Sequence, residues 1–251
     1  MRKIVVVGAS TGLGRCIGTG LAQRGAQVAL MARRKEKLED AAREAGPGTL
    51  AIACDVTDEA SCRSAIDEAA KGLGGIDAMV YAAAVGPLVR LEEADAAVWR
   101  NTFETNVIGA SLITAAAMNH LTESSGMVVY MSTTGASYTP PWPGLAVYQV
   151  TKAALDRLVE AWRAEHPTVG FTRLTVGECA GGEGDAQTQF NAGWDRELVR
   201  ELAPTWFARN FMSGSMIDVE HLVTMVDALL QAGASMTVPA MILTPRPKPQ
   251  V

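Results

Sequence analysis

A tyrosine and a lysine four positions apart, Tyr148 and Lys152, are the residues of this sequence most suited to chemistry. The pattern around them predicts a helix, and residues four apart share one face of a helix. A free phenol has a pKa of about 10 and exchanges protons poorly at pH 7, whereas a fixed ammonium favours its ionised form. The pair therefore indicates a phenol that donates or accepts a proton, with a simple surface pair as the alternative.

A hydroxyl and an amide extend this candidate site. Ser132 follows an apolar run that predicts a strand, and the carboxyl ends of parallel strands line one crevice. We expect Ser132 to donate a hydrogen bond to a substrate oxygen; Thr133 and Thr134 compete for this role, and bonding to the local backbone is the alternative. Asn106 opens a predicted buried helix, where its amide must find partners. We expect it to hold a water molecule beside Lys152, or else to cap its helix.

A glycine-rich segment lies between the first predicted strand, at residues 4–7, and the first predicted helix, at residues 13–24. Glycines permit a tight turn and a close approach of the backbone to a pyrophosphate, and the start of the helix then faces the anion. A plain glycine-rich turn is the alternative. The residues expected to bind a dinucleotide here are Gly8, Ser10, Thr11, Gly12, Leu13 and Gly14.

An acid follows the third predicted strand, at residues 49–54. We expect Asp55 to accept a hydrogen bond from an adenine amino group while Val56 packs nearby; an ordinary loop acid is the alternative. Thr57 is expected to cap the helix that follows, because its hydroxyl suits that position.

The end of the second predicted strand, at residues 27–32, distinguishes NAD from NADP. An acid there would bond both ribose hydroxyls and repel a 2′-phosphate. The sequence instead has Arg33, Arg34 and Lys35. These three cations favour NADP, with Arg33 preferred over Arg34 because it leaves the strand first; the alternative is the basic start of a solvated helix.

Strands and helices alternate along the chain. Continuous apolar runs indicate strands buried on both faces, and seven are expected, at residues 4–7, 27–32, 49–54, 76–83, 127–131, 169–176 and 238–243. Helical patterns separate them, among others at residues 107–121, 146–164 and 219–230. This order predicts an α/β fold of the Rossmann type: a doubly wound, seven-stranded parallel sheet with helices on both faces, in one domain covering residues 1–251.

Three segments interrupt the alternation. Residues 134–145 contain three prolines and are expected to form a loop. Residues 178–217 have weak periodicity and contain half of the phenylalanines and tryptophans. We expect them to form a mobile lid over a bulky, apolar ketone or alcohol, or alternatively a helical cluster or subunit contact. The proline-rich tail at residues 245–251 is expected to be extended.

Composition excludes several classes of protein. Of the 251 residues, 27 are acidic and 22 basic, without a Lys/Arg block, which disfavours nucleic-acid binding. No uninterrupted apolar run approaches the about 18 residues of a membrane span. The four cysteines form no CxxC pair and have no histidine at ligand spacing, so we expect no metal site, free thiols and a cytoplasmic location.

These motifs, in this order, resemble those of the short-chain dehydrogenase/reductase family over residues 1 to about 177 and, more loosely, in the final strand. The resemblance implies that Tyr148 donates or accepts the proton, that Lys152 contacts the cofactor ribose and lowers the pKa of Tyr148, that Ser132 contacts the substrate oxygen, and that Asn106 holds a relay water. It also implies NAD(P) binding, carbonyl–alcohol interconversion and a homotetramer or homodimer.

The sequence departs from the family pattern in three places, one of which is a gap between Ser132 and Tyr148 that is about three residues longer than usual. Residues 81–84 read Tyr-Ala-Ala-Ala where the family has Asn-Asn-Ala-Gly, although backbone contacts from Ala82 to a cofactor would persist. Cys179 and Ala180 replace Pro-Gly. The expected function is hydride transfer between NADP(H) and a carbonyl or secondary alcohol. A non-catalytic NADP(H)-binding regulatory protein is the alternative, and an isomerase or dehydratase is a third reading.

Overall fold

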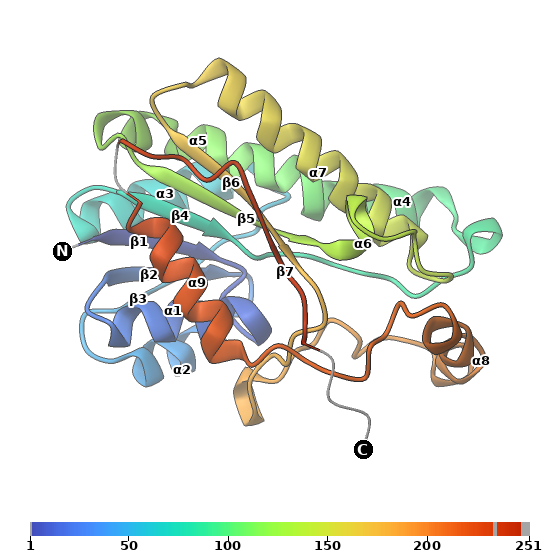
Figure 1. Cartoon of the computed structure of the whole chain (residues 1–251). Coiled ribbons are helices and arrows are strands. Elements are labelled where there is room, and N and C mark those ends of the chain that lie inside the picture. The colour runs from blue at the N-terminus through green and yellow to red at the C-terminus, as the bar shows by residue number, and fades with distance from the viewer. Residues whose placement is uncertain (1, 233–234, 247–251) are drawn as a thin grey trace.

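A seven-stranded, wholly parallel sheet forms the centre of the protein (Figure 1). The computed structural model describes residues 2–232 and 235–246. The strand order is β3-β2-β1-β4-β5-β6-β7, which confirms the predicted doubly wound α/β fold. The strands are β1 (Lys3–Val7), β2 (Gln27–Ala32), β3 (Leu50–Ala53), β4 (Ala78–Tyr81), β5 (Met127–Thr133), β6 (Gly170–Val176) and β7 (Ala240–Leu243).

Helices cover both faces of the sheet, because successive side chains of a strand point to opposite faces. On β1, Val5 and Val7 belong to one apolar core, and Ile4 and Val6 belong to the other. The first core is closed by α3 (Glu59–Leu73), α5 (Gly109–Glu123) and α7 (Ala146–Glu165), and the second by α1 (Gly12–Gln23), α2 (Lys35–Ala45) and α9 (Val219–Leu230).

The region before α5 differs from the predicted single helix at residues 107–121. A separate helix, α4 (Ala96–Phe103), begins at Asp95, whose side chain accepts hydrogen bonds from two backbone amides of the first turn. A π-helical turn, Glu104–Ile108, then connects α4 to α5. The hydroxyl of Tyr81, at the end of β4, donates to the carbonyl oxygen of Thr105 in this turn. Such turns often occur at functional sites.

The start of α3 corrects a second prediction. Asp58, rather than Thr57, caps this helix, because the Asp58 carboxylate accepts hydrogen bonds from the amides of Ala60 and Ser61. Thr57 instead bonds to Asp55 through its amide and hydroxyl. A carboxylate is the better cap here because the positive end of the helix dipole also attracts it.

The segments that interrupt the alternation of strands and helices contain short regular elements. The proline-containing segment starts with α6 (Thr134–Ser137), and the candidate lid contains α8 (Arg196–Ala208), which lies outside the layers formed by the sheet and its covering helices (Figure 1). Pro245 and Arg246 have no regular structure, and the rest of the predicted extended tail lies outside the described residues. Among the described helices, none combines the length and apolarity needed to cross a membrane.

Candidate active site

A cavity of about 1610 Å³ runs along the carboxyl ends of the strands, large enough for a dinucleotide and a second small molecule. Its lining includes Arg33 and Asp55 as well as Lys152 and Trp194. Most predicted site residues line it: Gly8, Ser10, Thr11, Gly12, Leu13, Gly14, Arg33, Arg34, Asp55, Val56, Ala82, Ser132, Tyr148 and Lys152. Asn106 does not.

The glycine-rich loop fits a bound phosphate. Gly8 has a φ of +87°, and a Cβ added there would lie 2.4 Å from the amide nitrogen of Ala83. A Cβ on Gly14 would lie 2.3 Å from the carbonyl oxygen of Gly8. Thr11 precedes α1, and its side chain makes no capping hydrogen bond to the described chain. The first amides of α1 can therefore donate to an anion, as a dinucleotide pyrophosphate requires.

Basic residues lie beside this loop. The Nη2 atom of Arg34 donates to the Ser10 and Thr11 hydroxyls, at 2.8 Å each. Arg33, which is exposed like Arg34, makes a charge contribution at Asp55. The pKa of Asp55 is lowered, first by the hydrogen bond from the Thr57 amide and least by Arg33. Arg34, the second choice from the sequence, is thus the arginine that contacts the glycine-rich loop.

Lys152 is a buried cation on α7. It is 2% exposed, and its ammonium donates to the carbonyl oxygen of Met131 at 2.7 Å. The Nζ atom lies 5.9 Å from the centre of the Tyr148 ring. Burial lowers the pKa of Lys152 to about 8, while the carboxylate of Asp156 opposes this change. The predicted pairing of phenol and amine on one helix face is therefore present.

The phenol of Tyr148 is less acidic than the sequence predicted. Burial raises its pKa and Asp156 adds to the rise, while the Thr133 side chain works against it. Lys152, whose ammonium donates to the Met131 carbonyl, is not among the groups that lower the pKa of Tyr148 in this structure. Tyr148 is consequently a protonated phenol at neutral pH in this structure.

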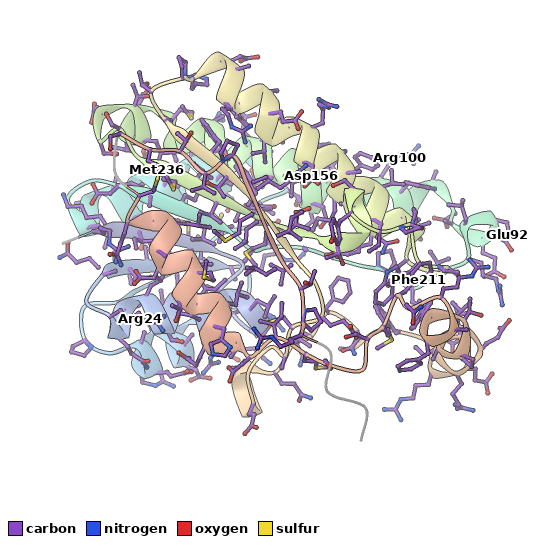
Figure 2. The ribbon with its side chains drawn as sticks, viewed as in Figure 1. Arg24, Glu92, Arg100, Asp156, Phe211 and Met236 are labelled. Carbon is purple, nitrogen blue, oxygen red and sulfur yellow. The ribbon has the colours of Figure 1, made fainter. Side chains whose placement is uncertain are left out.

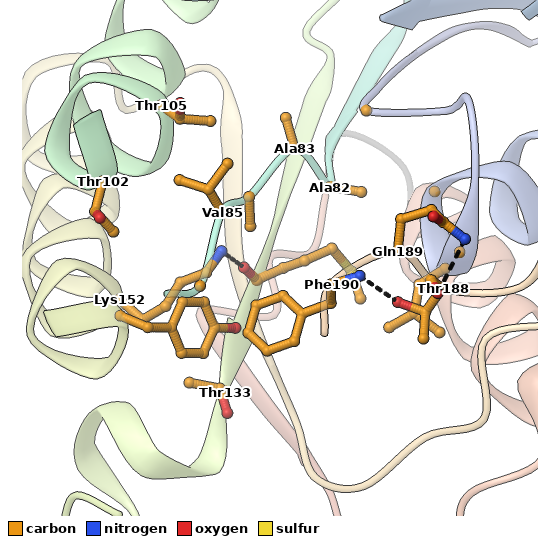
Figure 3. A pocket seen from close by; sticks show the side chains of 18 of the residues that line it. Ala82, Ala83, Val85, Thr102, Thr105, Thr133, Lys152, Thr188, Gln189 and Phe190 are labelled. Carbon is orange, nitrogen blue, oxygen red and sulfur yellow. Dashed lines mark hydrogen bonds between the residues drawn. The ribbon is translucent and has the colours of Figure 1, made fainter. Parts of the chain in front are cut away.

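Two hydroxyls near the end of β5 have different surroundings. Ser132 belongs to the strand itself and is 6% exposed, and its Oγ has no hydrogen-bond partner among the described residues. Burial raises the pKa of the nearby Asp156 carboxyl, and Ser132 is one of the groups that oppose this rise. Thr133, the next residue, interacts with Tyr148 and is seen at the wall of the cavity in Figure 3. Of the competing hydroxyls, Thr133 is the one that opposes the rise in the pKa of Tyr148.

The side chain of Asn106 bonds to protein groups through both its amide nitrogen and its amide oxygen. Its Nδ2 donates to the carbonyl oxygen of Val85 and to the Thr151 hydroxyl, both at 2.9 Å, and its Oδ1 accepts from the Val85 amide at 2.8 Å. These bonds connect the segment after β4 to α7. They hold one wall of the cavity, lined by Val85, against the helix that carries Tyr148 and Lys152.

Aromatic residues form a continuous wall above Tyr148. The ring of Phe190 meets that of Tyr148 edge-on, with centroids 4.9 Å apart. Neighbouring rings, 5.6–6.3 Å apart, continue the wall through Trp194, Trp206, Trp142 and Phe211. The indole nitrogens of Trp194 and Trp206 donate to the carbonyl oxygens of Gly86 and Pro143. The aromatic wall thus joins the candidate lid to both sides of the cavity.

Sequence reasoning missed two residues of this site. Thr188 packs against Gly12, and its hydroxyl accepts a hydrogen bond from the Phe190 amide (Figure 3). No periodicity in residues 178–217 indicates this contact. Asp156 stands four residues after Lys152, a spacing that predicts a shared helix face. This spacing could have identified Asp156 from the sequence.

The fold and the cavity define a known class of protein. The sequence profile described as short chain dehydrogenase matches residues 2–195, and the chain belongs to the short-chain dehydrogenase/reductase family. Among the relatives, 11-beta-hydroxysteroid dehydrogenase A of Sesamum indicum is 32% identical over 182 residues, which are 70% of this chain and 52% of that protein. The chain spans about half the length of the curated relatives it matches.

Solved structures share the fold. An alcohol dehydrogenase from the archaeon Thermococcus sibiricus, complexed with 5-hydroxy-NADP, is 23% identical, with a TM-score of 0.79 over 97% of this chain and 96% of that one. A 3-ketoacyl-(acyl-carrier-protein) reductase from Brucella melitensis, complexed with NADH, gives the same identity, TM-score and coverage.

Proposed function

We propose that the protein is an NADP-dependent oxidoreductase that transfers a hydride between NADP(H) and a carbonyl or secondary alcohol. The observation that carries this proposal is that one cavity is lined both by the glycine-rich loop and by Tyr148 and Lys152. A phosphate-binding loop alone would support only nucleotide binding. A proton-exchanging phenol in the same cavity supplies the second half of the reaction.

The residues of the cavity fit a nicotinamide dinucleotide. The glycine-rich loop would hold the pyrophosphate, Asp55 and Val56 the adenine, and Ala82 the cofactor through its backbone. Lys152 would contact the ribose. When bound, the cofactor supplies or accepts the hydride.

Tyr148 is the proposed proton donor in the direction of reduction. Burial keeps its phenol protonated at neutral pH, which suits donation to the oxygen of a ketone. Thr133 or Ser132 would orient that oxygen, and the interaction of Thr133 with Tyr148 favours Thr133. Asn106 contributes by fixing the cavity wall at Val85; the relay water remains a prediction from the family.

The choice of NADP rests on Arg33 and Arg34. Both line the cavity, and Arg34 already binds two hydroxyls of the phosphate loop. A guanidinium in this position suits a 2′-phosphate, because charged hydrogen bonds to phosphate are strong. Titration with NADPH and NADH tests this choice, and a clear preference for NADH would overturn it.

The proposed substrate is bulky and largely apolar. The aromatic wall adjoins Tyr148, and Phe190 lies against the phenol ring itself. Flat apolar rings would pack well on such a wall. Several relatives are named 11-beta-hydroxysteroid dehydrogenases, which points to the same class of substrate.

Other properties of the whole protein remain proposals. We propose one domain in which residues 178–217 act as the lid, no metal, no nucleic-acid or membrane partner, a cytoplasmic location, and assembly as a homotetramer or homodimer. A mobile lid would exclude water during hydride transfer.

A non-catalytic NADP(H)-binding regulatory protein is the second candidate. The Tyr-Ala-Ala-Ala sequence after β4 and the Cys179-Ala180 pair, both unusual for the family, favour it. The hydrogen bond from the Tyr81 hydroxyl to the π-helical turn weighs against it, because this bond stabilises the region after β4 although the Asn-Asn-Ala-Gly motif of the family is absent there.

Replacement of Tyr148 by Phe separates the two candidates. We expect Tyr148→Phe to bind NADPH as the wild type does and to lose turnover of an apolar ketone, because only the hydroxyl is removed. Turnover at the wild-type rate in this variant would refute the role of Tyr148. Nucleotide binding without turnover by the wild type, across a panel of ketones and secondary alcohols, would support the regulatory alternative.

A further inference from the structure

The ring of Phe190 lies directly against the phenol of Tyr148. The two rings meet edge-on, with centroids 4.9 Å apart and planes inclined at 65°. Both side chains line the cavity, and the Phe190 amide donates to the Thr188 hydroxyl at 3.2 Å, which fixes the backbone that carries the ring (Figure 3). A molecule that reaches the Tyr148 hydroxyl therefore has to fit beside this ring.

Gly86 provides the space in which the Phe190 ring lies. A Cβ added to Gly86 would lie 2.1 Å from Cζ and 2.2 Å from Cε2 of Phe190, well below the 3.5–4.0 Å of a normal contact between carbon atoms. The Gly86 carbonyl accepts a hydrogen bond from the Trp194 indole at 2.8 Å, and Asn106 holds the preceding residue, Val85. The seat of the ring is thus fixed on the wall side by hydrogen bonds.

The rest of the aromatic wall lies further from the phenol. The Trp194 ring meets Phe190 edge-on at 5.6 Å, and the wall ends at Phe211, which lies between α8 and the proline-containing segment (Figure 2). Among the aromatic side chains that the structure describes, Phe190 alone pairs with the Tyr148 ring. The wall as a whole bounds the cavity, whereas Phe190 bounds the space at the proton donor.

We propose that Phe190 is a specificity-determining residue that limits how thick a molecule can be beside the carbonyl group that it presents to Tyr148. The proposal rests on the proposed function. A ketone with one face free of substituents beside its carbonyl can lie flat against the Phe190 ring. Substituents on both faces would collide with that ring, and closely packed groups yield only at a cost in free energy. The substrate class is therefore a fused-ring ketone, or the matching alcohol, with one bare face beside the reacting carbon.

A pair of ketones tests the proposal. The first is a flat fused-ring ketone that the wild type reduces, with α-tetralone as the first choice, and the second carries two added methyl groups on the carbon beside the carbonyl, one on each face. The preference is the ratio of their kcat/KM values with NADPH. We expect Phe190→Ala to lower the preference of the wild type about tenfold or more. The lower intrinsic reactivity of the dimethyl ketone cancels, because the same pair is compared in both proteins.

Phe207→Ala is the matched control, because Phe207 is a lid phenylalanine that is 52% exposed; it should keep the wild-type preference. An unchanged preference in Phe190→Ala would overturn the proposal. Phe190→Leu, which keeps part of the volume, is the second variant if the alanine variant does not fold, and it should lower the preference by a smaller factor. NADPH binding, measured by fluorescence, shows that each variant keeps an intact glycine-rich loop.

Gly86→Ala tests the seat of the ring. The backbone of Gly86 lies outside the left-handed region, and the three atoms nearest to an added Cβ all belong to Phe190. We therefore expect Gly86→Ala to change the preference when Phe190 is present and to leave it unchanged when combined with Phe190→Ala. An effect of the same size in both backgrounds, including no effect in either, would overturn the proposal.

A second readout needs no turnover. In protein labelled with ¹³C in the tyrosine rings, the Tyr148 signal is assigned by its absence in Tyr148→Phe. Because an adjoining aromatic ring shifts such signals, we expect the Tyr148 signal to move in Phe190→Leu and to stay in Phe207→Leu. α-Tetralone should then shift the signal in the wild type, and its dimethyl derivative only in Phe190→Ala.

A Tyr148 signal that does not move in Phe190→Leu, or that the dimethyl ketone shifts equally in the wild type and in Phe190→Ala, would overturn the proposal. If the wild type reduces no ketone, the proposed function fails. The NMR comparison still decides whether Phe190 limits access to the phenol.

Discussion

At the scale of single residues, the site contains a charged group whose burial costs free energy. Lys152 is a cation that is 2% exposed and has one protein hydrogen bond, to the Met131 carbonyl, among the described residues. Desolvation of a charge costs free energy that a single neutral acceptor does not recover. A purely structural role would be filled better by an apolar side chain, and we infer that the ammonium is kept for its chemistry.

Lys152→Met is expected to stabilise the fold while abolishing turnover. The pKa falls from 10.5 in a free lysine to about 8 here, so removal of the charge should add up to about 3 kcal/mol to the free energy of unfolding at pH 7. Urea denaturation measures this change. A less stable variant would contradict the view of Lys152 as a costly buried cation.

The same shift predicts how stability varies with pH. The folded protein releases the Lys152 proton near pH 8 and the unfolded chain near pH 10.5. Between these values the unfolded chain binds more protons, so the contribution of this group makes the protein more stable as pH rises. Lys152→Met should lack this part of the rise.

Arg34→Ala is expected to weaken NADPH binding about tenfold or more, because a charged hydrogen bond contributes about 1.5–3 kcal/mol. NADH lacks the 2′-phosphate and should bind nearly as before. Arg33→Ala is the matched comparison, with a smaller loss, since among the described residues Arg34, and not Arg33, donates hydrogen bonds to the phosphate loop. Equal losses for both nucleotides in Arg34→Ala would contradict a 2′-phosphate site.

At the scale of elements, the candidate lid is held by aromatic contacts and indole hydrogen bonds. Trp194 donates to Gly86 after β4, and Trp206 donates to Pro143 before α7. Trp142, in the proline-containing segment, stacks on Phe211 with an interplanar angle of 11°. The lid is therefore fixed to two walls of the cavity through a small number of polar contacts.

Trp194→Phe tests this attachment. The variant keeps an aromatic ring but removes the hydrogen bond to Gly86, so we expect faster cleavage by protease within residues 178–217. Mass spectrometry of the fragments measures the site and rate of cleavage. Phe207→Ala is the control, because Phe207 is 52% exposed on α8. A cleavage rate unchanged from the wild type in Trp194→Phe would contradict a lid held by this bond.

Periodicity predicted the regular elements well and the irregular ones poorly. Strand β2 has the predicted bounds of residues 27–32, because its apolar run ends at charged residues. The π-helical turn at Glu104–Ile108 was not predictable, because it depends on the distant Tyr81 hydroxyl. Similarly, the surroundings of the Ser132 and Thr133 hydroxyls depend on how α7 packs over β5, which neighbouring residues do not specify.

At the scale of the whole molecule, the parallel sheet explains why the predicted site residues meet. Strands that run in one direction bring their carboxyl ends to one edge, so the loop after β1, Asp55 after β3 and Thr133 at the end of β5 line one cavity. The α7 helix then places Tyr148 and Lys152 over the same edge. The family membership of the chain agrees with this arrangement.

Transfer of a labelled hydride tests the central claim most directly. The protein is incubated with NADPH deuterated at nicotinamide C4, on either face in separate reactions, and with a polycyclic ketone, and the alcohol product is examined by mass spectrometry and NMR. We predict that one of the two labelled cofactors places deuterium on the carbinol carbon and that Tyr148→Phe forms no alcohol. Alcohol formed without the label from either cofactor, or no alcohol from any ketone tried, would contradict the account.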